Sequence, residues 1–230
     1  MAILRHITFT GFGVETDLKV LKEIQYEYPL VEWGVLLSKK WRENGPRFFD
    51  PSQLNRLRWQ GLNLSCHLCG SAARAVISEN WEPAFEVTHG MFGLFQRCQV
   101  NISMEQPNDQ TQYLRPPIDL SELIIQQKSA GAMNIFNAIK NRTKMSVLLD
   151  VSGGRGIDTP FKPLNIPGLK VGYAGGLNPD NVGEKLEHLM KNVNGEFWID
   201  MESGVRTDDM FDLNKVYKVL HVCQEVLASI

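Results

Sequence analysis

The chain of 230 residues has the length of one large domain or two small ones. Its 43% hydrophobic and 22% charged residues are near the average of globular proteins, which excludes a disordered chain, a coiled coil or a collagen-like repeat. Lysine and arginine number 24 against 26 aspartates and glutamates, so we expect no nucleic-acid partner. Because the apolar runs are too short to span a bilayer and the first residues lack a secretion signal, we expect no membrane partner and a cytoplasmic location.

Four cysteines are too few for a disulfide framework in a chain of this length. Cys66 and Cys69 form a C-x-x-C pair, but a structural zinc site needs a second pair of ligands, and Cys98 and Cys223 stand alone. We therefore expect no metal and no other cofactor.

Short β-rich apolar runs alternate with longer amphipathic segments, a pattern typical of a parallel α/β fold. The apolar runs predict eight strands, over residues 3–9, 33–37, 62–68, 98–102, 123–127, 146–150, 170–174 and 197–201. Helices are expected over residues 17–26, 51–59, 72–78 and 132–141, from about 179, and over 209–227. Asp50 is expected to cap the second of these helices, with Pro51 at its first position.

Eight strands with about as many crossovers predict a (β/α)₈ barrel, a fold of about 250 residues. No linker or shift in composition divides the chain, so residues 1–230 are expected to form a single domain. A doubly wound open sheet is the alternative.

Glycine and polar residues gather after strands six, seven and eight of this prediction. In a (β/α)₈ barrel these strand ends build the active site, and the loops after strands seven and eight often bind phosphate. Glycines let backbone N–H groups approach an anion without a Cβ in the way. We therefore expect a phosphate site at Gly154, Gly175, Gly176, Ser203 and Gly204.

The same segments resemble phosphoribosylanthranilate isomerase, a barrel isomerase of tryptophan biosynthesis. G-G-L-N-P-D-N-V from Gly175 and D-M-E-S-G-V from Asp200 resemble the family's S-G-G-L-N-P-E-N-V and D-V-S-S-G-V-E. Leu148-Leu149-Asp150 resembles the end of its sixth strand, and P-R-F-F-D-P from Pro46 resembles S-x-R-x-I-S-P after its second strand. The segment around Thr10 stands where the family has K-I-C-G-I-T, whereas residues 61–144 carry no matching motif.

The resemblance implies a phosphorylated sugar or aminosugar as ligand and an Amadori-type aldose–ketose isomerisation. It implies that Asp150 is the general acid that opens the sugar ring and that Arg47 holds the carboxylate of the anthranilate ring. The family's general base is a cysteine on strand one, and here that position is Thr10. Because a threonine hydroxyl ionises far less readily than a thiol, the threonine needs a second group to activate it.

Several residues could complete the catalytic pair. Cys66 and Cys69 lie within and just after strand three, and His67 should point opposite to Cys66 because strand residues alternate. Asp200, on the inner face of strand eight, is expected to have a polar role in binding substrate. Glu202 replaces the family's first serine on this strand, where it would repel a phosphate or else point outward.

Three functions remain open from the sequence. The favoured one is an isomerase-like barrel acting on a phosphorylated sugar, with Asp150 and Thr10 in the catalytic positions. The second is a barrel that binds a phosphorylated metabolite without converting it. The third is another phosphate-binding barrel enzyme, such as a Schiff-base aldolase, for which Lys128 after strand five is the candidate lysine. The sequence leaves the oligomeric state open.

Overall fold

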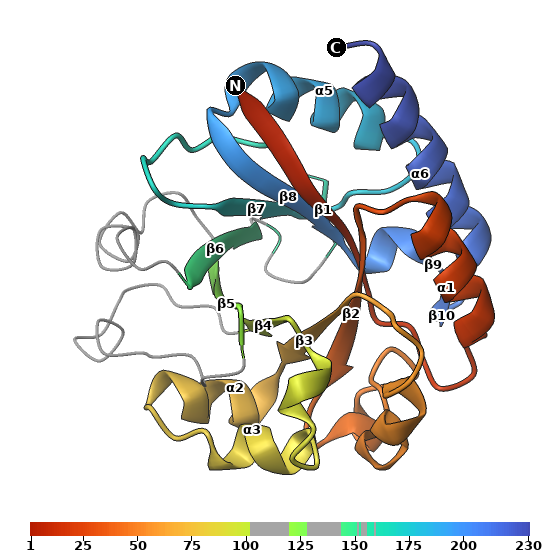
Figure 1. The fold of residues 1–230 in the computed structure, drawn as a ribbon, viewed down its shortest axis with the longest axis vertical. Helices are drawn as coiled ribbons and strands as arrows, with labels where there is room; N and C mark the ends of the chain where they lie inside the picture. The colour runs from red at the N-terminus through yellow and green to blue at the C-terminus, as the bar shows by residue number, and fades with distance from the viewer. Residues whose placement is uncertain (102–119, 128–143, 151, 153–155, 159) are drawn as a thin grey trace.

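A computed structural model describes residues 1–101, 120–127, 144–150, 152, 156–158 and 160–230. Eight parallel strands form a closed barrel in the order of the sequence (Figure 1). Strand β1 pairs with β2 on one side, where Ile7 lies opposite Val31, and with β8 on the other, where Ala2 lies opposite Gly195. The (β/α)₈ barrel is therefore confirmed, and the open sheet is excluded because β1 and β8 close the ring.

The strands begin and end within two residues of their expected bounds. They are β1 (Ala2–Thr10), β2 (Val31–Leu37), β3 (Leu64–Leu68), β4 (Arg97–Val100), β5 (Glu122–Gln127), β6 (Met145–Asp150), β7 (Val171–Ala174) and β8 (Gly195–Met201). Most of their buried valine, leucine and isoleucine side chains form one core with the surrounding helices, whereas a second, small cluster comprises Ile124, Leu148, Ala174 and Trp198. Alternate residues of each strand point to the inside of the barrel, which is where polar side chains can meet.

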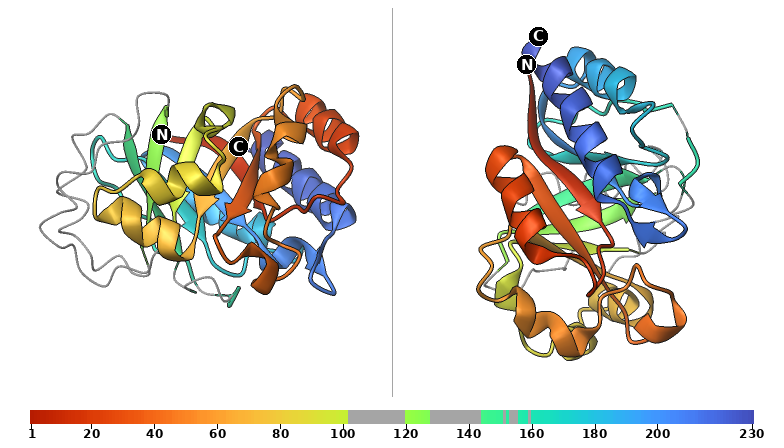
Figure 2. Two further views of the ribbon diagram at one scale, coloured as in Figure 1. Left: turned by 90° about the horizontal axis from the view of Figure 1, so that it is seen from below. Right: turned by 90° about the vertical axis from the view of Figure 1, so that its right-hand side faces the viewer.

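The described helices cover the outside of the barrel (Figures 1 and 2). They are α1 (Leu18–Glu27), α2 (Gly70–Ile77), α3 (Glu82–Val87), α5 (Val182–Asn192) and α6 (Leu213–Ala228). Asp17 caps α1 by accepting a hydrogen bond from the Lys19 N–H, so this helix begins where its sequence predicts. Helices α5 and α6 pack against each other, and α5 also contacts β1. Both chain ends lie at this side of the barrel (Figures 1 and 2).

Three segments differ from the sequence-based expectation. Pro51–Leu57 forms a 3-10 helix, which Asp50 caps through the Ser52 N–H as expected. Helix α3 was not expected at all. The final helix begins at Leu213 because β9 (Arg206–Thr207) and β10 (Met210–Phe211) first form a short hairpin. The helix expected over 132–141 lies outside the described residues.

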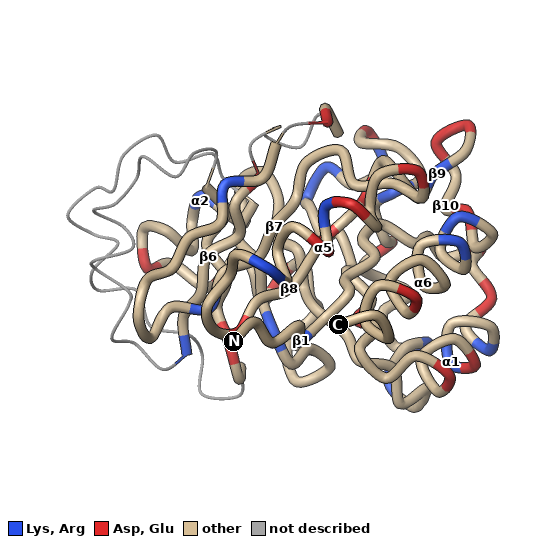
Figure 3. Tube along the Cα trace, turned by 90° about the horizontal axis from the view of Figure 1, so that it is seen from above, with Lys and Arg blue, Asp and Glu red and all other residues tan. Residues whose placement is uncertain are grey.

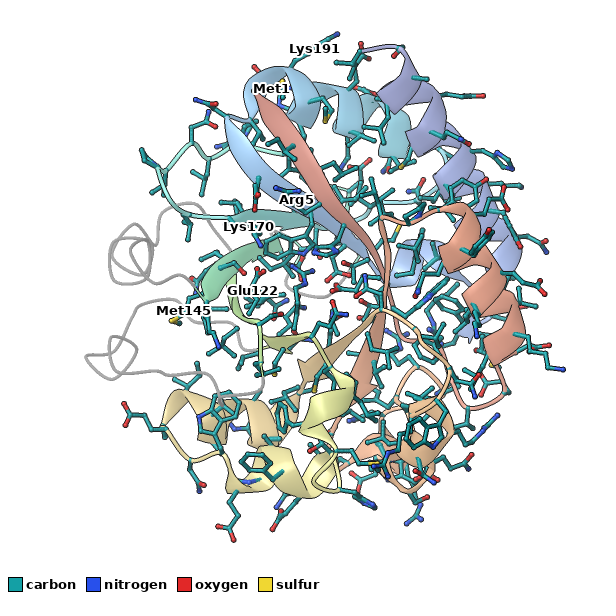
Figure 4. All side chains as sticks on the ribbon, viewed as in Figure 1. Met1, Arg5, Glu122, Met145, Lys170 and Lys191 are labelled. Carbon is teal, nitrogen blue, oxygen red and sulfur yellow. The ribbon has the colours of Figure 1, made fainter. Side chains whose placement is uncertain are left out.

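Charged side chains fill the barrel at the amino-terminal ends of its strands. The Arg97 guanidinium pairs with the fully buried Glu32 carboxylate at 2.7 Å and stacks on the Trp198 ring at 4.6 Å. Glu122 accepts a hydrogen bond from Lys170 Nζ at 2.7 Å, and Figure 4 shows these two side chains close together with Arg5 nearby. This layer fills the amino-terminal end of the barrel among the described residues, and a ligand site is therefore expected at the opposite, carboxyl-terminal end.

Along the Cα trace of Figure 3, lysines and arginines are interspersed with aspartates and glutamates in the described part of the chain. Within the described ranges, no helix is long and apolar enough to cross a membrane. The same residues contain no cluster of three metal-ligating side chains.

Candidate functional site

A cavity of about 370 Å³ opens at the carboxyl-terminal ends of the strands, and all eight strands contribute to its lining. The strand residues that line it are Thr10, Leu36, His67, Gln99, Gln126, Leu148, Asp150, Ala174, Asp200 and Met201. Leu148 and Asp150 of β6 both line the cavity with Leu149 between them, as strand alternation requires. Because parallel strands all end at this rim, polar side chains far apart in the sequence come together here.

The expected phosphate site borders this cavity. Gly175, Gly176, Ser203 and Gly204 all line it, whereas Gly154 lies outside the described residues. Gly176 has a φ of +68°, and a Cβ on it would lie 2.4 Å from the backbone nitrogen of Asp158. A Cβ on Gly204 would lie 1.8 Å from the carbonyl oxygen of Leu177. Both positions therefore require glycine, and the loops after β6, β7 and β8 pack tightly around one corner of the cavity.

Asp150, at the end of β6, is buried and firmly oriented. Its Oδ2 accepts a hydrogen bond from Gln126 Nε2 at 2.8 Å. Its Oδ1 accepts from the Ser152 hydroxyl at 2.7 Å and from the Ser152 N–H at 3.1 Å. The carboxyl group is thus held at the cavity wall next to the glycine turns, in the position expected for a catalytic group.

Asp200, at the end of β8, lies at the same cavity and contacts the threonine in the family's cysteine position. The Thr10 hydroxyl donates a hydrogen bond to Asp200 Oδ1 at 2.8 Å. Burial raises the pKa of Asp200 from its ordinary value of 3.8 to about 7, because few solvent molecules reach the carboxylate. The Thr10 hydrogen bond acts in the opposite direction and lowers this pKa. Asp200 can therefore both accept and release a proton near neutral pH.

The cysteines near β3 are poor candidates for the missing base. Cys66 points away from the cavity, and burial raises the pKa of its thiol well above the ordinary value. Cys69 does line the cavity, but burial raises its pKa to about 12, so it holds its proton at neutral pH. His67 also lines the cavity, as strand alternation predicts, and burial lowers its pKa to about 4. Its imidazole is therefore neutral.

Arg47 lines the cavity from the loop after β2, and its guanidinium forms ion pairs with two carboxylates of the protein. Its Nη1 donates to Glu202 Oε1 at 2.8 Å, and its Nη2 donates to Asp209. Glu202 thus points into the cavity rim toward Arg47 rather than outward. Burial raises the pKa of Glu202, whereas the Arg47 guanidinium lowers it.

Sequence reasoning missed a group of amide side chains in the cavity, Gln99, Asn101 and Gln126. Gln99 Nε2 lies 2.8 Å from Asn101 Oδ1 and 3.2 Å from His67 Nδ1. Gln99 Oε1 is buried without a hydrogen-bond partner among the described residues. Gln99 and Asn101 lie two positions apart in C-Q-V-N, at the end of an otherwise apolar strand. This spacing of polar residues is the sequence signal that could have revealed them. Lys128, the candidate Schiff-base lysine, lies outside the described residues.

The closed ring of strands and the cavity at its carboxyl-terminal rim define the protein as a (β/α)₈ barrel with an enzyme-like pocket. A family model described as N-(5'-phosphoribosyl)anthranilate isomerase matches residues 108–222, half of the chain. The chain therefore belongs to this isomerase family. The match includes residues 108–144, where we recognised no motif, and begins after the segments around Thr10 and Arg47.

Solved structures share the fold along nearly the whole chain. The N-(5'-phosphoribosyl)anthranilate isomerase of Pyrococcus furiosus has a TM-score of 0.58 at 17% identity, over 96% of this chain and 98% of its own. TrpF from Jonesia denitrificans has a TM-score of 0.59 at 14% identity, over 98% and 99%. A phosphoribosyl anthranilate isomerase in complex with reduced 1-(o-carboxyphenylamino)-1-deoxyribulose 5-phosphate has a TM-score of 0.56 at 14% identity, over 97% and 100%. No curated protein sequence matches the chain.

Proposed function

We propose that this protein isomerises a phosphorylated sugar or aminosugar from its aldose to its ketose form, with no cofactor. The observation that carries the proposal is the presence of two buried carboxyl groups, Asp150 and Asp200, at one cavity. Gly175, Gly176, Ser203 and Gly204 offer a corner in which a phosphate could lie against backbone N–H groups. Family membership supports the same reaction class.

In the proposed reaction, Asp150 donates a proton to the ring oxygen of the sugar while the bond from C1 to that oxygen breaks. The lone pair of the C1 substituent forms a double bond to C1. Asp200 then accepts the proton from C2, and the electron pair of that C–H bond forms a C1–C2 double bond while the electron pair of the double bond between C1 and its substituent returns to the substituent. The enol relaxes to the ketose when its hydroxyl proton leaves and C1 gains a proton. Acid and base catalysis of this kind typically contribute about 10² to 10⁴-fold each.

Thr10 has a positioning role in this proposal. A threonine hydroxyl cannot replace a thiolate as a base, because its proton is far less acidic. Its hydrogen bond at 2.8 Å instead orients the Asp200 carboxylate and lowers its pKa toward neutrality. The base is therefore the carboxylate of β8, and the threonine of β1 keeps it in place.

The test is to incubate the protein with phosphoribosylanthranilate and follow loss of the aminosugar. Asp150→Asn and Asp200→Asn should each lower kcat by about 10² to 10⁴-fold. Asp208→Asn is the matched control, since Asp208 is exposed in the β9–β10 turn and outside the cavity lining. Activity of the unaltered protein should rise with pH through about 7, because Asp200 must lose its proton to act as base. A decrease in activity through the same pH range would indicate that Asp200 is the general acid and Asp150 the general base.

Lack of turnover would overturn the proposal for this substrate. The binding barrel without catalysis is the remaining alternative, and inorganic phosphate distinguishes it. Phosphate should raise the Tm by mass action in either case, whereas chloride at matched ionic strength should not. A protein that binds phosphate but converts no phosphorylated sugar would support the binding barrel.

A further inference from the structure

Two carboxylates of the protein pair with the guanidinium that would receive a ligand carboxylate. Arg47 donates from one nitrogen to Glu202 at 2.8 Å and from the other to Asp209. A guanidinium has three donor nitrogens with five N–H groups, so Arg47 keeps further donors, but its single positive charge already faces two carboxylates. A ligand carboxylate would have to share this cation with Glu202 and Asp209 or displace one of them.

The second arginine of this region offers no replacement. Arg206 Nη1 donates to the carbonyl oxygen of Gly11 at 2.6 Å, and its Nε donates to the carbonyl oxygen of Asp209 at 3.1 Å. Arg206 is also absent from the described cavity lining and is buried. Its guanidinium therefore holds the loops after β1 and β8 together rather than facing a ligand.

The charge around the cavity also disfavours a second anionic group on the ligand. Among the described lining residues Arg47 is the one permanent cation, and Asp150, Asp200 and Glu202 are carboxyl groups. His67 adds no charge, because burial lowers its pKa to about 4. A phosphate already places negative charge beside Glu202, which directly precedes Ser203. A ligand carboxylate would add repulsion from the same side.

We infer that the natural ligand carries a phosphate at one end and, at the end that lies over Arg47, an uncharged or cationic group that donates hydrogen bonds to Glu202. The inference rests on the proposed function and narrows its substrate class. It excludes an aromatic carboxylate as the preferred group at that position. Glu202 determines this specificity, because its carboxylate already pairs with Arg47 and would repel a ligand carboxylate at the same place.

The experiment compares two stable ligands that differ in one group. The first is reduced 1-(o-carboxyphenylamino)-1-deoxyribulose 5-phosphate, and the second is the same compound without its carboxyl group. Both are titrated calorimetrically into the unaltered protein and into Glu202→Gln. Glu187→Gln is the matched control, since Glu187 is an exposed residue of α5 that pairs with Lys191.

The unaltered protein should bind the compound without the carboxyl group about tenfold more tightly or better, as expected for one charge-assisted interaction. Glu202→Gln should reverse this preference because it removes one of the two carboxylates that pair with Arg47, and Glu187→Gln should leave the preference unchanged. An increased Tm with inorganic phosphate would show that the Glu202→Gln variant is folded and keeps its phosphate corner.

Two outcomes would overturn the inference in distinguishable ways. Equal or tighter binding of the carboxylated compound by the unaltered protein would refute the role of Glu202 while leaving the proposed function in place. A preference that Glu202→Gln does not alter would do the same. If neither compound binds any of the three proteins, the result would refute a sugar-phosphate ligand and, with it, the proposed function.

Discussion

Replacing Thr10 with valine should move the pKa of Asp200 upward. Valine has nearly the shape of threonine but no hydroxyl, so Asp200 Oδ1 loses its hydrogen bond at 2.8 Å. Gln99 Nε2, 3.5 Å from Asp200 Oδ2, is too far away to compensate. A hydrogen bond to a charged group contributes about 1.5 to 3 kcal/mol, and one pKa unit corresponds to about 1.4 kcal/mol. The pKa of Asp200, about 7 in the unaltered protein, should therefore rise by about one to two units.

This change has a pH signature. With Asp200 as base, activity requires its ionised form, so the rising limb of the kcat/KM profile should move to higher pH by the same amount. At pH 7 the ionised fraction falls from about one half to about one tenth or less, which lowers kcat/KM by about 5- to 50-fold. Activity should return near pH 10. Thr10→Ser, which keeps the hydroxyl, should retain the original profile.

Carbon NMR of the aspartate carboxyl groups measures the same pKa in the free protein and needs no substrate. An unchanged pKa in Thr10→Val would show that the hydrogen bond does not control Asp200. A loss of activity that is equal at every pH would show that Thr10 acts on the substrate directly.

Three further changes test the surrounding structure. Asp200→Asn should stabilise the protein at pH 8 but not at pH 4. The pKa of Asp200 is about 7 in the folded protein and has an ordinary value of 3.8, so the free energy of unfolding falls by up to about 4 kcal/mol as the pH rises from 3.8 to 7. Arg97→Met should lower the free energy of unfolding by about 3 to 5 kcal/mol, because it leaves the Glu32 carboxylate buried and unpaired. Adding Glu32→Gln should restore much of the lost stability, and denaturant unfolding measures the stability of both variants. Gly204→Ala should abolish the increase in Tm with inorganic phosphate, because its Cβ would lie 1.8 Å from the Leu177 carbonyl oxygen.

The barrel could be predicted from the sequence because each strand is a short apolar run with a clear boundary. Asp150 and Asp200 follow such runs directly, and the parallel order of the strands then brings their side chains to one rim. The β9–β10 hairpin was missed because its strands have two residues each, too few to show alternation. Asp208 and Asp209 form its turn in the left-handed conformation, which aspartate tolerates better than most residues.

The partner of Arg47 could not be predicted from the sequence. Glu202 is 155 residues away, and its side chain reaches Arg47 only because β8 closes against β1 and the loop after β2 folds over the rim. Strand alternation gives the face on which a residue lies but not the partner that its long side chain selects. The same limit applies to the pKa of Asp200, which depends on burial by the whole ring of strands.

Thr10→Cys should change the isomerase activity in opposite directions depending on whether residue 10 or Asp200 provides the base. If the family's cysteine position alone provided the base, Thr10→Cys should raise isomerase activity. In this structure, however, a thiol there would lie beside the Asp200 carboxylate, and burial already raises the pKa of the nearby Cys69 to about 12. Thr10→Cys should therefore lower activity at pH 7, because a thiol is a weak hydrogen-bond donor to Asp200 and a poor base beside a negative charge. The double variant Thr10→Cys, Asp200→Asn lacks that charge and should recover activity, with the rising limb of its pH profile at higher pH. A gain of activity from Thr10→Cys alone would refute Asp200 as the base.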